Sequence, residues 1–257
     1  MSVAGADTFI ESEGRKLWGH LARPPDDNPA RSKKCALVLA HGFPTAPGWV
    51  ESSGTTYPEF ADRLATVADW IVLAIHFRGI GKSEGDFSLA GWLDDLRAAV
   101  AYLREQEGVG GVWLAGFRTG GALALCLAGE DPDIRGVATF SAPADFDAWA
   151  ANPRTILAEA RTVGAVRSPA FPADQAVWAR GFKEIRPLAA MAKIPPRPML
   201  LVHGTIDDAV PVADARALAD EAGGSADLRI ITGAGHRLRH DPRAVAILVG
   251  WLERQDL

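Results

Sequence analysis

Residues 112 to 128 read Val-Trp-Leu-Ala-Gly-Phe-Arg-Thr-Gly-Gly-Ala-Leu-Ala-Leu-Cys-Leu-Ala. The first part, residues 112–117, is apolar and typical of a buried strand. The second part, from Gly121 onward, is typical of a buried helix. Only Arg118, Thr119 and Gly120 separate the two. This stretch therefore predicts a sharp strand-to-helix corner.

The central residue of that corner is Arg118. Gly116, Arg118 and Gly120 have the spacing of the Gly-x-Ser-x-Gly signature, a strained corner that lifts a nucleophilic serine above a sheet. A guanidinium has five donors, no acceptor lone pair and a permanent charge, so it cannot attack a carbonyl. The sequence retains the setting of a nucleophile and lacks the reactive atom.

The rest of the chain alternates strands with helices. Residues 8–12 and 16–22 predict an opening antiparallel hairpin. A stripe of apolar residues from Leu89 to Leu103 predicts an amphipathic helix. Buried-strand patterns lie at residues 35–41, 70–77, 112–117, 136–141, 199–203 and 228–232. This order predicts an α/β fold with a mostly parallel sheet, and ligands that bind beyond the carboxyl ends of its strands.

Residues 144–195 interrupt this alternation. They contain no strand-like run, and helical periodicity appears at residues 155–163 and 174–182. Long insertions between core strands often have a function. We therefore predict a helical cap over 144–195, on a core formed by 1–143 and 196–257. Phe146, Trp149 and Trp178 are expected to line a pocket under it; the alternative is a structural excursion that covers the sheet edge.

Three further motifs follow predicted strands. The loop His41-Gly-Phe-Pro places the backbone N–H of Phe43 as one oxyanion-hole donor, with the N–H of Thr119 as the other. Asp207 follows the strand that ends at His203, and His236 follows the last strand. Asp208 is an alternative acid, but the interval before Val210 and Pro211 favours Asp207.

By these motifs, and by the loop Arg78-Gly-Ile-Gly-Lys-Ser, the chain resembles the α/β-hydrolase superfamily over nearly its whole length. It is similar to the dienelactone-hydrolase-like, esterase-like and acyl-peptidase-like members. The chain order of corner, acid and histidine is the one this fold uses. The resemblance implies an eight-stranded twisted sheet, a helical cap and acyl or ester hydrolysis as the ancestral chemistry. It implies that Asp207 and His236 are acid and base, while Arg118 departs from the pattern.

No other residue restores a nucleophile next to a base. Ser83 lies in a Gly-rich loop and is expected to form a turn. The side chain of Thr119 should turn into the start of the helix, and Cys126 should lie in the core.

Four roles are open for Arg118. It could pair with Asp207, plug the pocket, or bind an anionic ligand near the positive end of the following helix. The fourth reading is a degenerate site. The sequence favours a catalytically silent or atypical protein that binds a small molecule. The alternative is an active ester or acyl hydrolase in which His236, oriented by Asp207, activates water and Arg118 binds the anion.

Composition narrows the class of protein and its partners. With 257 residues, 48% hydrophobic and 23% charged, the chain fits one soluble domain. A net charge of −5 disfavours nucleic acid and anionic membranes as partners, which leaves a small-molecule ligand or substrate. Cys35 and Cys126 are expected to be buried thiols in a reducing compartment, rather than a disulfide. The absence of a recognisable leader or membrane span predicts a cytoplasmic protein.

Three further histidines, His41, His76 and His203, lie at predicted strand ends, so a metal site has to be considered. Their spacings match no compact zinc signature. We expect neither a metal nor a cofactor.

Overall fold

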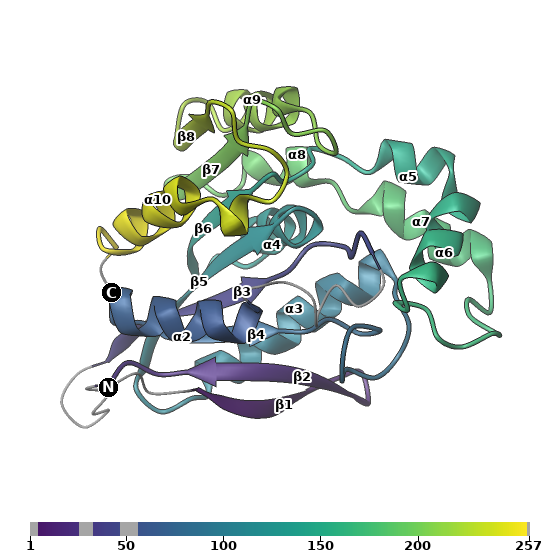
Figure 1. Ribbon diagram of the computed structural model, residues 1–257, viewed down its shortest axis with the longest axis horizontal. Coiled ribbons are helices and arrows are strands. Elements are labelled where there is room, and N and C mark those ends of the chain that lie inside the picture. Colours follow the sequence, from purple (N-terminus) through teal and green to yellow (C-terminus); the bar gives the residue numbers. More distant parts are fainter. Residues whose placement is uncertain (1–4, 26–32, 47–55, 256–257) are drawn as a thin grey trace.

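An eight-stranded sheet forms the centre of the molecule (Figure 1). The computed structural model describes residues 5–25, 33–46 and 56–255. The strands are β1 (Ala6–Ser12), β2 (Arg15–Ala22), β3 (Lys34–Ala40), β4 (Ile71–Ile75), β5 (Val109–Phe117), β6 (Ile134–Phe140), β7 (Met199–Gly204) and β8 (Ala226–Ile231). Their order across the sheet is β1-β2-β4-β3-β5-β6-β7-β8. β2 pairs antiparallel with β1 and with β4, and the other pairs are parallel, which confirms the predicted α/β sheet.

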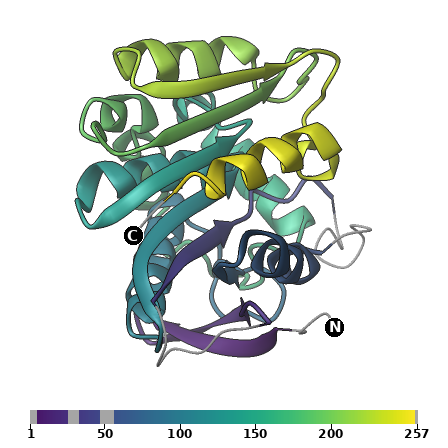
Figure 2. The same cartoon turned by 90° about the vertical axis from the view of Figure 1, so that its left-hand side faces the viewer.

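Helices cover both faces of this sheet. α2 (Tyr57–Ala68) and α10 (Pro242–Leu252) pack on one face, where Figure 2 shows them in dark blue and yellow. α3 (Leu89–Arg104), α4 (Thr119–Glu130) and α9 (Val212–Glu221) pack on the other. Successive side chains of a strand point to opposite faces, so Val38 joins the core under α3 and α4, while Leu37 and Leu39 join the core under α2 and α10. Burial on both faces explains the continuous apolar runs of the central strands.

The segment 144–195 is helical, as predicted, and contains no strand in any of its residues, all of which are described. It forms α5 (Asp147–Ala151), α6 (Pro153–Thr162), α7 (Gln175–Glu184) and α8 (Pro187–Met191). In Figure 1, α5, α6 and α7 stand together apart from the helices that flank the sheet. Arg167 attaches this segment to the loop after β4, because its N–H donates to Asp86 Oδ1 at 2.6 Å and its guanidinium donates to the carbonyl of Ser83.

Two predictions about cysteines and membrane spans can be compared with the fold. Cys35 and Cys126 are free thiols. Cys126 is buried, and burial raises its pKa to about 12. Cys35, expected to be buried, is only partly so, because it lies near the start of β3 at the end of the sheet. Among the described helices, none combines the length and the apolar character that crossing a bilayer requires.

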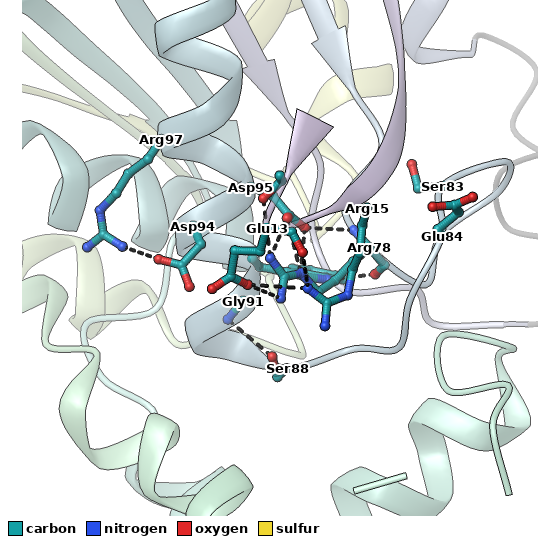
Figure 3. Close-up of polar contacts among 12 residues, drawn as sticks. Glu13, Arg15, Arg78, Ser83, Glu84, Ser88, Gly91, Asp94, Asp95 and Arg97 are labelled. Atoms are coloured by element: carbon teal, nitrogen blue, oxygen red, sulfur yellow. Dashed lines mark hydrogen bonds and ion pairs between the residues drawn. The ribbon is translucent and has the colours of Figure 1, made fainter. Parts of the chain in front are cut away.

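A buried ion pair fastens the loop after β4 to α3 (Figure 3). Asp95 is fully buried and accepts from the Arg78 backbone N–H at 2.8 Å and from the Arg78 guanidinium at 2.7 Å. The same guanidinium donates to Glu13 Oε2 at 2.9 Å, in the turn between β1 and β2. Arg78 therefore joins three segments that are distant in sequence.

We expect the Asp95→Ala variant to lose about 3–5 kcal/mol of the free energy of unfolding, because it leaves a buried guanidinium without its main counterion. Asp94 is the matched control. It pairs with Arg97 at the surface, where 37% of the Asp94 side chain is exposed. Such pairs contribute at most about 1 kcal/mol. Denaturant unfolding of both variants tests this, and equal losses would contradict the structural role of Asp95.

Candidate functional site

The corner between β5 and α4 has the strained backbone predicted from the sequence. Arg118 has φ 55° and ψ −123°, a region that residues with a side chain rarely adopt. Its N–H donates to the carbonyl of Phe140 at 2.7 Å, and its carbonyl accepts from the N–H of Ala122 at 3.1 Å. The corner is therefore held on both sides by backbone hydrogen bonds.

Glycines permit the close packing of this corner. A Cβ on Gly116 would overlap the carbonyl of Gly120, and a Cβ on Gly120 would overlap the carbonyl of His41. A Cβ on Gly121 would lie 2.8 Å from the carbonyl oxygen of Gly116. The first turn of α4 thus lies directly against the ends of β5 and β3, which explains why the sequence has glycine at these three positions.

The Arg118 side chain lies against the loop after β3. A Cβ built on Gly42 would come within 2.8 Å of Arg118 Cβ and 3.1 Å of its Cδ. The Nε atom is buried without a hydrogen-bond partner, and no described carboxylate forms an ion pair with the guanidinium. Burial lowers the pKa of Arg118; Tyr57 and, to a smaller extent, Asp207 oppose that effect, and Arg237 adds to it. The pairing with Asp207 that the sequence left open is therefore not formed.

Asp207 and His236 meet as the sequence predicts. His236 Nδ1 donates to Asp207 Oδ1 at 2.8 Å, and the same oxygen accepts from the N–H groups of Ala209 at 3.0 Å and Val210 at 2.9 Å. Burial alone would raise the pKa of Asp207, but these hydrogen bonds, that of His236 first, hold it well below its usual range. The carboxylate is therefore ionised and fixes the ring. The alternative acid, Asp208, is exposed.

The second nitrogen of His236 is unused. Nε2 is buried and has no hydrogen-bond partner, and only 10% of the side chain is exposed. Because Nδ1–H donates to Asp207, the neutral ring keeps its lone pair on Nε2. In a serine triad this atom takes the proton of the nucleophile. No described hydroxyl or thiol bonds to it.

The two predicted oxyanion-hole amides have no described acceptor. Phe43 follows Gly42 in the loop after β3, and Thr119 is the first residue of α4. Free N–H groups at these positions are what an oxyanion hole requires. Arg118 occupies the space beside Gly42, immediately before one of the two donors.

The predicted pocket aromatics pack mainly on one another and on the core. The rings of Trp149 and Phe43 are 5.3 Å apart, and those of Phe146 and Trp149 are 5.2 Å apart. Trp178 Nε1 donates to the carbonyl of Phe87 at 2.9 Å. These side chains therefore fix the helical segment against the loop that carries Phe43. Their contact with a ligand stays a prediction.

A cavity that includes His236 lies between the acid loop and the histidine loop. Its volume is about 530 Å³. The residues that line it are Ile206, Asp208, Gly235, His236, Arg237, His240, Asp241 and Pro242. His236 contributes to the wall of this cavity, while its Nε2 atom is buried.

The remaining candidate residues have structural roles. Ser83 Oγ donates to the carbonyl of His76 at 2.6 Å and accepts from the N–H of Trp18 at 2.9 Å, so it fastens a turn. His41 Nδ1 donates to the carbonyl of Gly42, and its Nε2 accepts from the N–H of Phe77. Over residues 5–25, 33–46 and 56–255, no three His, Cys, Asp or Glu side chains gather as a metal site would require.

Sequence reasoning missed three residues near the site. The Arg239 guanidinium lies 4.6 Å from the ring centre of Tyr57, beside the loop of His41. Ser141 is fully buried at the end of β6, with φ 52°, and its hydroxyl helps to lower the pKa of Asp207. The only sequence signal for Arg239 is the basic run after His236, and Ser141 has none beyond its place after a strand.

The fold and the arrangement of corner, acid and histidine define an α/β hydrolase. Residues 32–176, more than half of the chain, match the family described as serine aminopeptidase, S33. The chain therefore belongs to the serine aminopeptidase S33 family.

The curated relatives of this chain include proteins from Escherichia coli. This chain is 25% identical over 205 residues to the uncharacterized protein YfhR of Escherichia coli. The matched region covers 79% of this chain and 63% of that protein. The chain thus spans under two thirds of the length of these curated relatives.

Solved structures share the fold. Est1E from Butyrivibrio proteoclasticus with bound ferulic acid is 23% identical, with a TM-score of 0.70 and 96% of each chain covered. The Pyrococcus furiosus esterase Pf2001 is 23% identical, with a TM-score of 0.68, covering 96% of this chain and 91% of that one. The α/β hydrolase GrgF from Penicillium sp. sh18 is 18% identical, with a TM-score of 0.72, covering 98% and 99%.

The buried histidines make the stability of the protein depend on pH. Burial lowers the pKa of His41 to about 4 and that of His76 to about 3. An unfolded histidine binds its proton near pH ~6.5. As the pH falls from there towards 4, the unfolded state holds more protons than the folded state, so the free energy of unfolding decreases.

In the His41→Gln variant we expect the slope of the free energy of unfolding against pH to fall by the contribution of one proton, about 1.4 kcal/mol per pH unit. His76 and His240, whose pKa values are also lowered by burial, keep their own contributions. Urea unfolding between about pH 4.5 and 6.5 measures the slope, which is independent of any constant loss of stability that the substitution causes. A slope equal to that of the wild type would mean that His41 titrates normally in the folded protein.

Proposed function

We propose that this α/β-hydrolase-fold protein binds a small molecule and does not hydrolyse esters or peptides through a serine-type mechanism. The observation that carries the proposal is the position of Arg118, whose backbone has the strained conformation of the nucleophile corner and whose side chain cannot attack. Family membership supports hydrolytic ancestry. Without a nucleophile at the corner, this chain lacks the group that serine-type hydrolysis requires.

The rest of the site supports binding. His236 remains oriented by Asp207, and the cavity beside it has about 530 Å³, a volume suited to a small organic molecule. The net charge of −5 offers no basis for nucleic acid or an anionic membrane surface as the partner.

The purified wild-type protein should be silent on a panel of p-nitrophenyl esters, thioesters, lactones and aminoacyl p-nitroanilides. Loss of a triad member leaves at most the residual acceleration of the binding groups, roughly 10³- to 10⁴-fold over water. The matched control is His236→Ala. Robust wild-type turnover that disappears in this variant would overturn the proposal.

Restoring the nucleophile tests whether the surrounding site is intact. We expect Arg118→Ser to hydrolyse p-nitrophenyl acetate at least about a hundredfold faster than the wild type and to be labelled by a fluorophosphonate, because removing the serine from an intact triad costs on the order of 10⁶-fold. Arg118→Ala is the control for relief of crowding, and Arg118→Ser with His236→Ala is the control for the base. An inert but folded Arg118→Ser variant would show that the acid–histidine pair and the amides no longer form a working site.

One observation favours a second function. The unpartnered Nε2 of His236, with its lone pair and its Asp207 partner, could act as a general base on a water molecule, while Arg118 binds the acyl or leaving-group anion. In that case wild-type hydrolysis should be present and should fall in both His236→Ala and Arg118→Ala. Unchanged or higher activity of Arg118→Ala would exclude this role for the arginine.

A further inference from the structure

Arg118 is a mostly buried cation, and no carboxylate among residues 5–25, 33–46 and 56–255 forms an ion pair with it. Buried charges and buried N–H groups normally have hydrogen-bond partners, yet Arg118 Nε has none. Asp207, whose charge acts on Arg118, accepts from His236 and from two backbone amides through Oδ1, and its Oδ2 is buried without a hydrogen-bond partner. Arg237, close enough to lower the pKa of Arg118, adds charge of the same sign. The site has an excess of positive charge that a ligand can neutralise.

Two further polar groups of the site have no partner among the described residues. The N–H of Thr119 has no described acceptor at the start of the twelve-residue helix α4, where the helix dipole favours an anion. His236 supplies an independent sign, because nine tenths of its side chain is buried and its Nε2 has no partner. The imidazole keeps its Nδ1–H on Asp207, which leaves Nε2 for a ligand.

We infer that the ligand is a small organic monocarboxylate, with its carboxylate bound at Arg118 and its apolar part in the cavity beside His236. This inference rests on the proposed function as a binding protein. The planar guanidinium matches a carboxylate through paired N–H donors. Arg237 lines the cavity and its charge lowers the pKa of Arg118, so the cavity lies within electrostatic reach of that guanidinium.

The cavity wall agrees with an apolar tail. Ile206 is 64% exposed and lines the cavity together with Pro242, which gives a tail apolar surface to cover. Two carboxylates also line it. Asp241 is bound to Arg243 at 2.7 Å and Asp208 is exposed. The head group of an anionic ligand is therefore expected at Arg118, away from these two residues.

Calorimetric titration of the full chain with hexanoate tests this inference. Hexanamide is the neutral control of equal size, and acetate, inorganic phosphate and sodium chloride at matched ionic strength are the controls for the tail and for any anion. We expect hexanoate to bind at least about tenfold more tightly than hexanamide and acetate, and Arg118→Gln to weaken it by at least about tenfold. Arg63→Gln, which alters an exposed arginine on α2, should change nothing.

Equal binding of hexanoate and hexanamide by the wild type would overturn the inference, and so would unchanged binding by a folded Arg118→Gln. Phosphate binding as tight as that of hexanoate would overturn the claim that the site selects a carboxylate with an apolar tail. The comparison of these ligands on the wild-type protein tests the inference even if Arg118→Gln fails to fold. Ester turnover by the wild type would contradict the proposed function while leaving this titration valid; absence of binding by a silent protein would contradict only the inference.

Discussion

The strained backbone at Arg118 is the constraint on which the rest of the site depends. A residue held at φ 55° and ψ −123° costs about 1–3 kcal/mol. It persists only because α4 starts against the ends of β5 and β3, where any side chain at Gly116 or Gly120 would overlap backbone. This packing fixes the loop of Gly42 and Phe43, and the aromatic contact between Phe43 and Trp149 then places the helical segment. The geometry of the corner is thus independent of which side chain it presents.

The hydrogen bonds of Asp207 are concentrated on one of its two carboxylate oxygens. One carboxylate oxygen already accepts three hydrogen bonds, from His236, Ala209 and Val210, and these keep the carboxylate ionised and oriented. A guanidinium that took this acceptor would leave His236 Nδ1 without its partner. The network is fully formed on that oxygen, whereas Oδ2 is buried without a hydrogen-bond partner, and Arg118 pairs with neither oxygen.

Much of the fold and part of the site could be predicted from the sequence. The central strands are buried on both faces, which gives the uninterrupted apolar runs at residues 71–75 and 199–204. Asp207 was preferred over Asp208 on spacing alone, and it is the residue that binds His236.

The direction of the Arg118 side chain could not be predicted, because it depends on the loop of Gly42, more than 70 residues away. The same holds for Arg239, which meets Tyr57 only through the fold. Likewise, the spacing of the aromatic residues indicates that Trp149 is buried. It does not indicate whether another aromatic ring or a ligand packs against the Trp149 side chain.

A cation at the nucleophile position also changes which state of a bound molecule the neighbouring N–H donors stabilise. In a hydrolase the oxyanion-hole amides are most effective when they bind the transition state better than the ground state. A guanidinium beside them stabilises a full negative charge in the ground state, including that of any carboxylate product. Even if His236 activated water, the product would therefore be bound tightly, and turnover would be limited by its release. Under the proposed function, tight retention of an anion would thus follow wherever the charged Arg118 side chain and the N–H of Thr119 bind the same group.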